Sequence, residues 1–352
     1  MDTIDLFNLV HPHDPPPCPR PAIRKRDLMS RSVLVTGGAG YIGSHMVLHL
    51  LDAGYEPVAY DNLSTGRREA VCGGALIVAD LADKRCLEAV FAEHRIAAVM
   101  HMAASTAVAE SVAEPLQYYR NNVANTLRLL ACCRKSGVEH VVFSSSAAVY
   151  GIPPGGICEE TCLPAPINPY GTTKWVGEMM LQDLAASGVL RYVALRYFNA
   201  AGADSASRTG ECGPEAAHLV KVACQAATGK RPGVTVFGND YDTPDGTCVR
   251  DYVHVGDVAR AHIDALHHLE RGGDSLVLNC GGGEGHSVLQ VLDQVMAISG
   301  VEFPVTIGAR RDGDPPRLVA ANDRIRAELG WRPRHGLDEM IASALAWERK
   351  LG

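Results

Sequence analysis

Residues 36–43 read Thr-Gly-Gly-Ala-Gly-Tyr-Ile-Gly and join the first predicted strand to the first predicted helix. Gly37, Gly40 and Gly43 have the spacing of a dinucleotide-binding loop, in which missing side chains let the backbone turn sharply and approach a pyrophosphate. The N-terminus of the helix would face the phosphates with free N–H groups and the positive end of its dipole. A glycine pattern alone also fits a simple tight turn, but its position between a strand and a helix favours the dinucleotide loop.

Outward from this loop, apolar strands alternate with helical patterns. Strand–helix–strand alternation with right-handed crossovers predicts an α/β fold with a Rossmann-type, doubly wound parallel sheet. After residue 200 the pattern becomes irregular and holds isolated helices, which predicts a smaller C-terminal substrate-binding lobe. The expected strands are residues 32–36, 57–60, 75–79, 97–101, 138–144 and 191–196, and the expected helices are residues 41–53, 84–94, 114–136, 170–187, 215–228, 256–271, 287–299 and 337–350.

The first 28 residues differ in character from the rest of the chain. Residues 11–21 are proline-rich, and proline fits neither a helix interior nor a central strand. Residues 1–28 are therefore expected to form a disordered extension, or to precede a true translation start at Met29. A Rossmann domain over residues 29–199 and a lobe over residues 200–352, interleaved with it, complete the predicted organisation.

The composition is that of an ordinary soluble globular protein, with 47% apolar residues, 21% charged residues and a net charge of -7 over 352 residues. The acidic balance argues against a nucleic-acid partner, and no stretch approaches the roughly 18 apolar residues of a membrane span. The N-terminus lacks the basic start and apolar core of a secretory signal. The 11 cysteines form no CxxC pair, so we expect reduced thiols, no metal site, no membrane association and a cytoplasmic location.

Two aspartates end predicted strands near the glycine loop. Asp61 ends the second strand, where a carboxylate accepts hydrogen bonds from the adenosine ribose and repels a 2′-phosphate, so NAD is favoured over NADP. The neighbouring Arg67 and Arg68 weaken that preference. A turn-forming role is the alternative for Asp61 and for Asp80, which ends the third strand and is otherwise expected to contact adenine.

Tyr170 and Lys174 are four residues apart at the start of a predicted helix, so their side chains share one face. A phenol, with a pKa of about 10, is a poor base at neutral pH, but a nearby ammonium and a nicotinamide cation stabilise the phenolate. Tyr170 could then take a proton from a substrate hydroxyl. Ser146 ends a serine run at the fifth strand, where ligands bind in doubly wound sheets, and is expected to bridge substrate and Tyr170. Capping of the strand end is expected of Ser144 or Ser145 instead.

At this point the residues match a known family over residues 32–351. In order they read TGGAGYIGSH, DNLSTG, SSSAAVYG, NPYGTTK, RYFNAAGA, FGNDYDTPDGTCVRDYVHV and RRDGDPPR. They resemble the extended short-chain dehydrogenase/reductases and, among these, most closely the UDP-glucose 4-epimerases. The resemblance implies an isomerase with a tightly held NAD, which inverts C4 of UDP-glucose and UDP-galactose through a 4-keto intermediate.

The resemblance also implies roles for individual residues. The catalytic set is Ser146, Tyr170 and Lys174. The cofactor set is Gly37, Gly40, Tyr41, Ile42, Gly43, Asp61, Asn62, Asp80, Leu81, Met102, Ala103, Ala104, Asn122, Tyr170, Lys174 and Tyr197. The UDP-sugar set is Ser146, Asn199, His218, Leu219, Arg250, Arg311, Asp314 and Leu318. Arginines suit the last set because they bind pyrophosphate bidentately, although a surface pair with Asp251 is the alternative for Arg250.

Three positions depart from the family pattern. Thr106 replaces a lysine that can contact the cofactor, and Ala104 replaces a glycine in the same loop. His218 stands where an asparagine commonly contacts the substrate. Cofactor affinity and the position of the sugar could both differ for these reasons.

Several alternatives stay open at this stage. Leu318 is intermediate in size at the position beside the sugar, which leaves UDP-N-acetylglucosamine, UDP-xylose or UDP-glucuronate as preferred substrates. A nucleotide-sugar 4,6-dehydratase would need Asp-Glu where Ala147 and Ala148 stand, and a non-catalytic NAD-binding regulator would not need the catalytic set. The resemblance further implies a homodimer through residues 114–136 and 170–187. The product could serve galactose metabolism or an exopolysaccharide.

Overall fold

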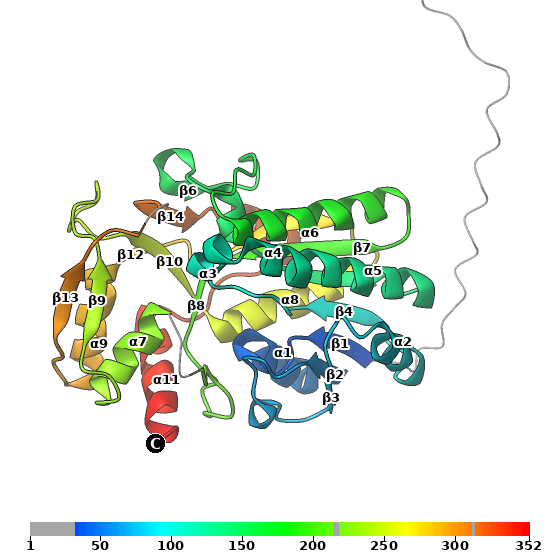
Figure 1. Ribbon diagram of the computed structural model, residues 1–352, viewed down its shortest axis with the longest axis horizontal. Coiled ribbons are helices and arrows are strands. Elements are labelled where there is room, and N and C mark those ends of the chain that lie inside the picture. The colour runs from blue at the N-terminus through cyan, green and yellow to red at the C-terminus, as the bar shows by residue number, and fades with distance from the viewer. Residues whose placement is uncertain (1–31, 214–217, 312–313) are drawn as a thin grey trace, which may run out of the picture. The chain divides into compact units, whose positions relative to one another are not determined.

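The large sheet contains seven strands, which the computed structural model arranges in the order β11-β7-β5-β4-β1-β2-β3 (Figure 1). All neighbouring strands are parallel, and β1 has β4 on one side and β2 on the other. The chain therefore winds outward from β1 in both directions, and the predicted doubly wound α/β class is confirmed. The strands are β1 (Ser32–Thr36), β2 (Glu56–Asp61), β3 (Ala75–Val78), β4 (Ala98–His101), β5 (His140–Ser146), β7 (Arg191–Tyr197) and β11 (Leu276–Cys280).

The structure describes residues 32–213, 218–311 and 314–352, and these form one compact unit. The expectations for residues 1–28 and for Met29 lie outside the described residues. Within the described residues, none of the helices has the length and apolar character to cross a bilayer.

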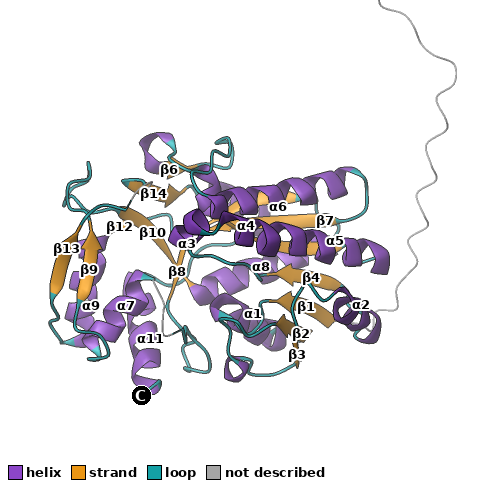
Figure 2. Cartoon of the chain, viewed as in Figure 1, coloured by secondary structure: helices purple, strands orange, loops and turns teal. Residues whose placement is uncertain are grey.

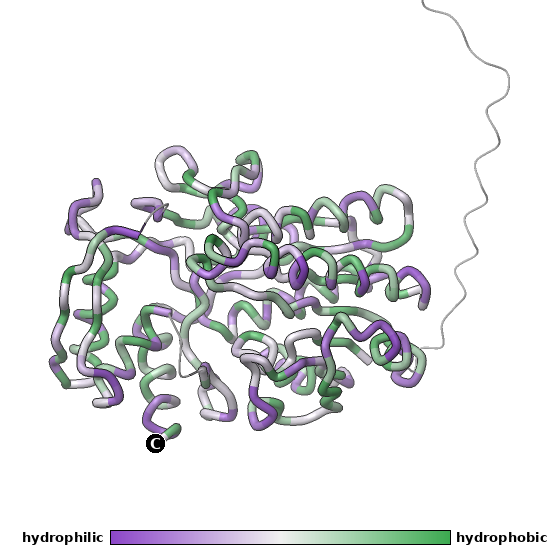
Figure 3. The backbone as a smooth tube through the Cα atoms, viewed as in Figure 1, coloured by the Kyte–Doolittle hydropathy of each residue, from purple (hydrophilic) through white to green (hydrophobic). Residues whose placement is uncertain are grey.

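Helices cover both faces of the large sheet (Figure 2). One apolar core lies under α1 (Tyr41–Asp52), α8 (Val255–Glu270) and α10 (Asp323–Leu329), and a second lies under α2 (Lys84–Glu93), α5 (Asn125–Ser136) and α6 (Pro169–Ala186). Hydrophobic and hydrophilic residues alternate along most of these helices (Figure 3), which bury one stripe, whereas α1 is buried on all sides from Gly43 to Leu48. All five residues of β1 are buried, as expected for a parallel strand covered on both faces.

The helix predicted over residues 114–136 begins at Pro115 and runs to Ser136, with a π-helical turn inside it. The chain forms α3 (Val108–Ala113), α4 (Pro115–Tyr118), the π-helical turn η2 (Tyr119–Ala124) and only then α5. Proline lacks an N–H and restricts the residue before it, and Glu114 accordingly leaves the helical region at φ -124° and ψ 58°. The break between α3 and α4 therefore follows from Pro115, which starts the predicted helix.

The fifth strand is shifted by two residues from its predicted position at residues 138–144. Gly137 ends α5 in the left-handed conformation with φ 66°, and the amide of Val138 still bonds to Cys133. The turn consequently occupies the start of the predicted strand, and β5 extends to Ser146.

The chain after residue 200 contributes to both parts of the molecule. It supplies α8 and β11 to the large sheet, and α7, α9 and α11 to a third apolar core. The boundary at residues 199–200 stays a prediction. The short strands of this part were not predicted; β8 pairs with β10, which joins a sheet in the order β12-β10-β14-β6, and β13 pairs with β9. These elements are β6 (Ile157–Cys158), β8 (Asn199–Ala201), α7 (Leu219–Ala227), β9 (Val234–Phe237), β10 (Val249–His254), β12 (Gly285–Ser287), α9 (Val288–Ser299), β13 (Val305–Gly308), β14 (Arg317–Ala320) and α11 (Leu337–Lys350).

Candidate active site

The candidate site lies at the carboxyl edge of the large sheet, where the strands β1, β4, β5 and β7 end. The glycine loop follows β1, a loop containing Met102 follows β4, and the 3₁₀ turn η3 (Ala147–Tyr150) follows β5. Ligands of doubly wound sheets bind at this edge, near the point where the winding reverses. The order of the strands therefore brings the glycine loop and the serine run to the same edge.

The glycine loop is packed too tightly for side chains. Gly37 has φ +69°, and a Cβ there would lie 2.8 Å from the backbone nitrogen of Ala103. A Cβ on Gly43 would meet the carbonyl group of Gly37, with the carbonyl carbon at 2.7 Å. No side chain caps α1, and its first turn holds no acid. The first turn of α1, which includes Tyr41 and Ile42, can therefore present N–H groups to an anion.

Asp61 joins the end of β2 to the glycine loop. One carboxylate oxygen accepts from the amide of Ala39 at 2.9 Å, and the other accepts from the amide of Leu63 at 2.8 Å. Asp61 therefore both forms a turn, through Leu63, and lies beside the glycine loop, through Ala39. A carboxylate oxygen has a second lone pair, so these bonds leave acceptor capacity for a ribose hydroxyl. That ribose contact stays a prediction.

Asp80 accepts from the amide of Ala82 at 2.7 Å and from the side-chain amide of Asn62, also at 2.7 Å. Leu81, next to it, is buried. The structure thus brings together Asn62, Asp80 and Leu81, and their contacts with adenine stay predictions.

The loop after β4 is held against the first strand and against α6. The amide of Met102 donates to Thr36, and the amide of Ala103 donates to the hydroxyl of Thr36 at 3.3 Å. Asn122, in the π-helical turn, accepts from the amide of Ser105 at 2.8 Å and donates to Thr173 at 3.0 Å. Its amide group therefore anchors the loop that contains Ala104. The side-chain amide of Asn122 is already used in these bonds, and its direct contact with NAD stays a prediction.

Tyr170 and Lys174 lie one turn apart in α6, and both are buried. Asn168 caps the helix by accepting from the amide of Gly171 at 2.8 Å. The ammonium of Lys174 donates to the carbonyl oxygen of Ser144 at 2.7 Å and lies 6.0 Å from the ring centre of Tyr170. The sequence spacing therefore places the phenol and the ammonium on one face, next to the end of β5.

Burial dominates the proton affinity of both groups. It raises the pKa of Tyr170, and a hydrogen bond with Ser146 opposes this rise. Burial also lowers the pKa of Lys174 to about 7, and the charge of Glu178 opposes that fall. Without a cofactor cation the phenol is consequently protonated at neutral pH. The expected lowering of the phenol pKa by Lys174 together with a nicotinamide cation stays a prediction.

The three serines have different roles from those expected. Ser146 accepts from the amide of Ala148 at 3.1 Å and caps η3, so the assignment of capping to Ser144 or Ser145 is wrong. Ser145 is buried and donates to Glu178. The reason is that β5 extends two residues further than predicted, which moves the end of the strand to Ser146.

Two residues below the catalytic pair were missed. Glu178 follows Lys174 by one turn and forms a buried ion pair with Arg196, at 2.6 and 2.9 Å. The i+4 spacing from Lys174 was a usable signal for Glu178. Tyr197, a predicted cofactor residue, pairs in register with Ser146, and burial raises its pKa.

Three of the eight predicted UDP-sugar residues, Asn199, Arg250 and Leu318, lie on β8, β10 and β14. Asn199 donates to the carbonyl oxygen of Asp251 at 2.9 Å. Arg250 forms an ion pair with Asp314, so the alternative of a surface pair with Asp251 is wrong. Successive residues of a strand point to opposite faces, which keeps the two side chains apart. Leu318 lies beside Arg250 in the β10–β14 register.

Two further predicted residues stack or pair on other elements. The guanidinium of Arg311 lies 4.0 Å from the ring centre of Phe237. His218 precedes Leu219 at the start of α7 and contacts Glu211 through its Nδ1 at 2.6 Å. Burial lowers the pKa of His218, but the bond to Glu211 prevails and raises it. Glu211 was missed, and we see no sequence signal for it.

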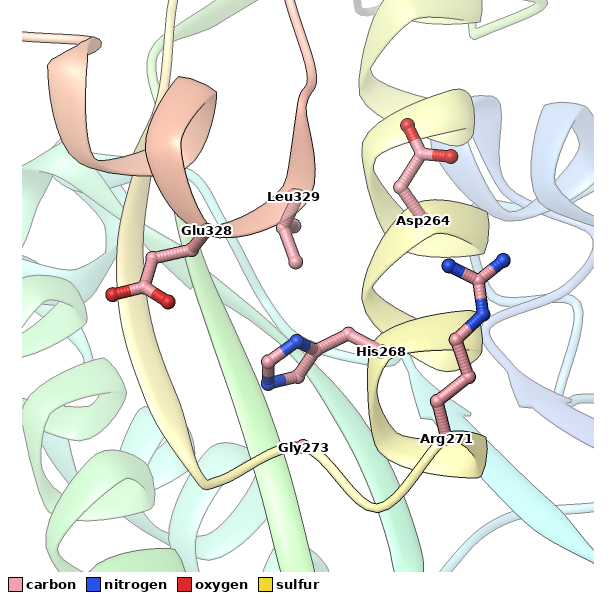
Figure 4. Close-up of a pocket in the computed structure, with 6 residues that line it drawn as sticks. All are labelled: Asp264, His268, Arg271, Gly273, Glu328 and Leu329. Atoms are coloured by element: carbon pink, nitrogen blue, oxygen red, sulfur yellow. The ribbon is translucent and has the colours of Figure 1, made fainter.

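A shallow pocket of about 190 Å³ lies elsewhere, between α8 and α10 (Figure 4). It is lined by residues such as Asp264, His268 and Glu328, and includes Gly273 just before β11. That places it at the amino edge of the sheet, opposite the candidate site, and it contains none of the predicted site residues. Within the described ranges no cluster of three or more His, Cys, Asp or Glu side chains could hold a metal ion.

Known proteins resemble this chain over most of its length. The model of the NAD dependent epimerase/dehydratase family matches residues 33–281. A UDP-glucose 4-epimerase of Azospirillum brasilense is 55% identical over 92% of this chain and 93% of its own. A crystal structure of UDP-glucose 4-epimerase from Brucella ovis in complex with NAD has 46% identity and a TM-score of 0.87, covering 90% of this chain and 97% of its own. The crystal structure of UDP-glucose-4-epimerase from Stenotrophomonas maltophila, with bound NAD and formylated UDP-arabinopyranose, has 41% identity and a TM-score of 0.88. It covers 91% of this chain and 98% of its own.

Proposed function

The chain belongs to the NAD dependent epimerase/dehydratase family, and from that premise we propose that its site inverts C4 of UDP-glucose and UDP-galactose through a 4-keto intermediate. The observation that carries the proposal is the placement of Ser146, at the end of β5, and of Tyr170 beside the ammonium of Lys174, all at the edge that holds the glycine loop. The family is NAD-dependent, and the enzyme is an isomerase.

The glycine loop fits a dinucleotide. Side chains at Gly37 or Gly43 would collide with backbone atoms, and the uncapped start of α1 leaves its amides available for a diphosphate. Asp61 and Asp80 supply acceptors beside it for ribose and adenine hydroxyl and amino groups. Bound NAD would supply the redox chemistry, as the acceptor of a hydride from C4 and the donor of that hydride to the opposite face of the sugar.

Tyr170 serves as the base for the 4-hydroxyl group. Its pKa is raised by burial, so it needs a nearby positive charge to deprotonate, which Lys174 and a bound nicotinamide cation would provide together. Ser146 holds the substrate hydroxyl in line with the phenol oxygen. After the ketone has rotated to present the opposite face of C4, Tyr170 returns the proton to the 4-oxygen.

The nucleotide anchor is built from charges that pair with each other. Arg250 and Asp314 form an ion pair. When a UDP-sugar binds, the arginines would bind its diphosphate and the carboxylate of Asp314 would accept hydrogen bonds from its ribose hydroxyls. Arg311 adds a second guanidinium. Firm binding of UDP and loose binding of the sugar lets the ketone rotate without escaping.

The finer assignments follow the same reasoning. Leu318 packs against an apolar cluster that includes Ala147 and Val149 of η3, where a leucine leaves more room than an aromatic ring, so UDP-N-acetylglucosamine is a second substrate. The exposed apolar residues Val112, Leu116 and Leu127, with exposures of 63%, 77% and 59%, favour a homodimer through these helices and α6. A cytoplasmic location and a role in galactose or exopolysaccharide metabolism complete the proposal.

The test is a substrate panel on the purified protein without added NAD. C4 inversion is followed for UDP-galactose, UDP-N-acetylgalactosamine, UDP-arabinose and UDP-galacturonate. Inversion of UDP-galactose without net release of NADH supports the proposal. A strong preference for another sugar keeps the mechanism and changes the substrate, and no inversion even with added NAD refutes the proposal.

A further inference from the structure

Asp251 is a carboxylate buried without a cation. It lies in β10 between Arg250 and Tyr252, is 0% exposed, and takes part in no ion pair among the described residues. Burial raises its pKa to about 7, although three backbone amides oppose the rise. A carboxyl group in such surroundings destabilises the fold when it ionises, which makes a role beyond packing a reasonable hypothesis.

The three amides come from two other segments of the chain. Gly282 donates to one carboxylate oxygen at 2.5 Å. Gly283 and Ala320 donate to the other oxygen, at 2.9 and 3.0 Å. The neighbouring Gly281 also has to be a glycine, because a Cβ there would lie 2.6 Å from the same carboxylate. One side chain thus joins β10, the turn after β11 and β14.

Two of these segments carry candidate site residues, and the third adjoins the catalytic sheet. β10 carries Arg250, and β14 carries Leu318 two residues before Ala320. The turn at Gly282 follows Cys280, which pairs with Tyr197, and Tyr197 pairs with Ser146. The carboxylate of Asp251 is therefore a direct link between the strands that would hold the UDP-sugar and the outer strands of the catalytic sheet.

We propose that Asp251 is a positioning residue, which fixes the strands of Arg250 and Leu318 relative to the catalytic sheet. The proposal rests on the proposed function. β10 and β14 pair directly through Val249 and Arg250, so the UDP-binding residues on these strands keep their arrangement without the carboxylate. Without the carboxylate, the distance between the UDP-binding strands and Tyr170 is no longer fixed. A shift of about 1 Å in the position of the sugar can lower the rate on the order of 100-fold.

The test replaces Asp251 by asparagine, because the side-chain NH₂ would then face backbone N–H groups and repel at least one of them. The expected result is a kcat for UDP-galactose at least about tenfold lower, with the Kd for UDP and the NAD content changed by less than about twofold. The matched control is Asp257→Asn. Asp257 is also buried, but it accepts from Arg260 and from the amides of Arg334 and His335, which carry no part of the site.

Both variants are compared below their melting temperatures. A kcat no lower than that of Asp257→Asn, or a loss confined to the Kd for UDP, overturns the proposal. If Asp251→Asn does not fold, the proposal is tested by amide hydrogen exchange of the wild-type protein with and without UDP. The amides of Gly282, Gly283 and Ala320 are expected to slow by a common factor when UDP binds, and unchanged exchange overturns the proposal. Neither exchange nor UDP binding requires turnover, so a wild type that fails to invert UDP-galactose refutes the proposed function separately.

Discussion

The Gly43→Ala substitution tests the glycine loop most directly. The added Cβ would lie 2.7 Å from the carbonyl carbon of Gly37 and 2.9 Å from the Cα of Gly38, with the oxygen of Gly37 closer still. All three are backbone atoms, so no side chain can rotate away. The loop and the first turn of α1 must separate by on the order of 1 Å, because protein interiors have no free volume of that size.

Overpacking of this kind costs about 1–3 kcal/mol. If the strain falls on the NAD-binding conformation, affinity falls about 5- to 150-fold, at 1.4 kcal/mol per factor of ten. The assay is the NAD content of the purified protein, read together with its melting temperature. Gly137→Ala is the control: its φ of +66° strains any side chain, but a Cβ there meets nothing within 4 Å. Equal NAD content and turnover in the two variants would refute the reasoning.

Three further outcomes are expected. Tyr170→Phe removes the base and should lower kcat by about 10²- to 10⁴-fold at unchanged NAD content; intact activity would contradict the catalytic assignment. Glu178→Gln leaves Arg196 buried without its partner, so denaturant titration should show a loss of about 3–5 kcal/mol, and a loss below about 1 kcal/mol would contradict it. The free energy of unfolding should also fall as the pH drops from about 6.5 towards 4, since buried histidines cannot take up the protons that the unfolded chain binds. The histidines, with pKa values lowered by burial, are His45, His254 and His262 to about 4 and His101 to about 3. The raised pKa values of Asp251 and Asp264 oppose this trend, but they are fewer than the four histidines, so a melting temperature that rises on acidification would refute the prediction.

The local pattern of the sequence was sufficient for the first half of the sheet. Each of these strands is an apolar run between turn residues, and most of the helices bury one stripe, so the sequence pattern alone located them. The Tyr170–Lys174 spacing likewise needed only the geometry of one helix. The helix start at Pro115 lies within one residue of its predicted position, whereas the π-helical turn after it has no comparable sequence signal.

The remaining parts depend on contacts between distant segments. β6 and β8 are two and three residues long, too short for a periodic pattern, and their conformation is set by their partner strands. The pair of Arg250 and Asp314 is separated by 64 residues. The role of Asp251 depends on amides of residues 282, 283 and 320, and backbone amides have no sequence signature.

The late position of β11 in the sequence has a consequence for biosynthesis. β7 ends at Tyr197, but the strand that covers its outer side ends only at Cys280. At roughly 5–20 residues per second, the ribosome needs about 4–17 s to make the intervening segment. During that time β7 is an open apolar edge on the nascent chain, the kind of edge that recruits other strands. The sheet is completed only after most of the second part has been synthesised, so a ribosome stalled between these two strands would carry an aggregation-prone chain and a natural client for a chaperone.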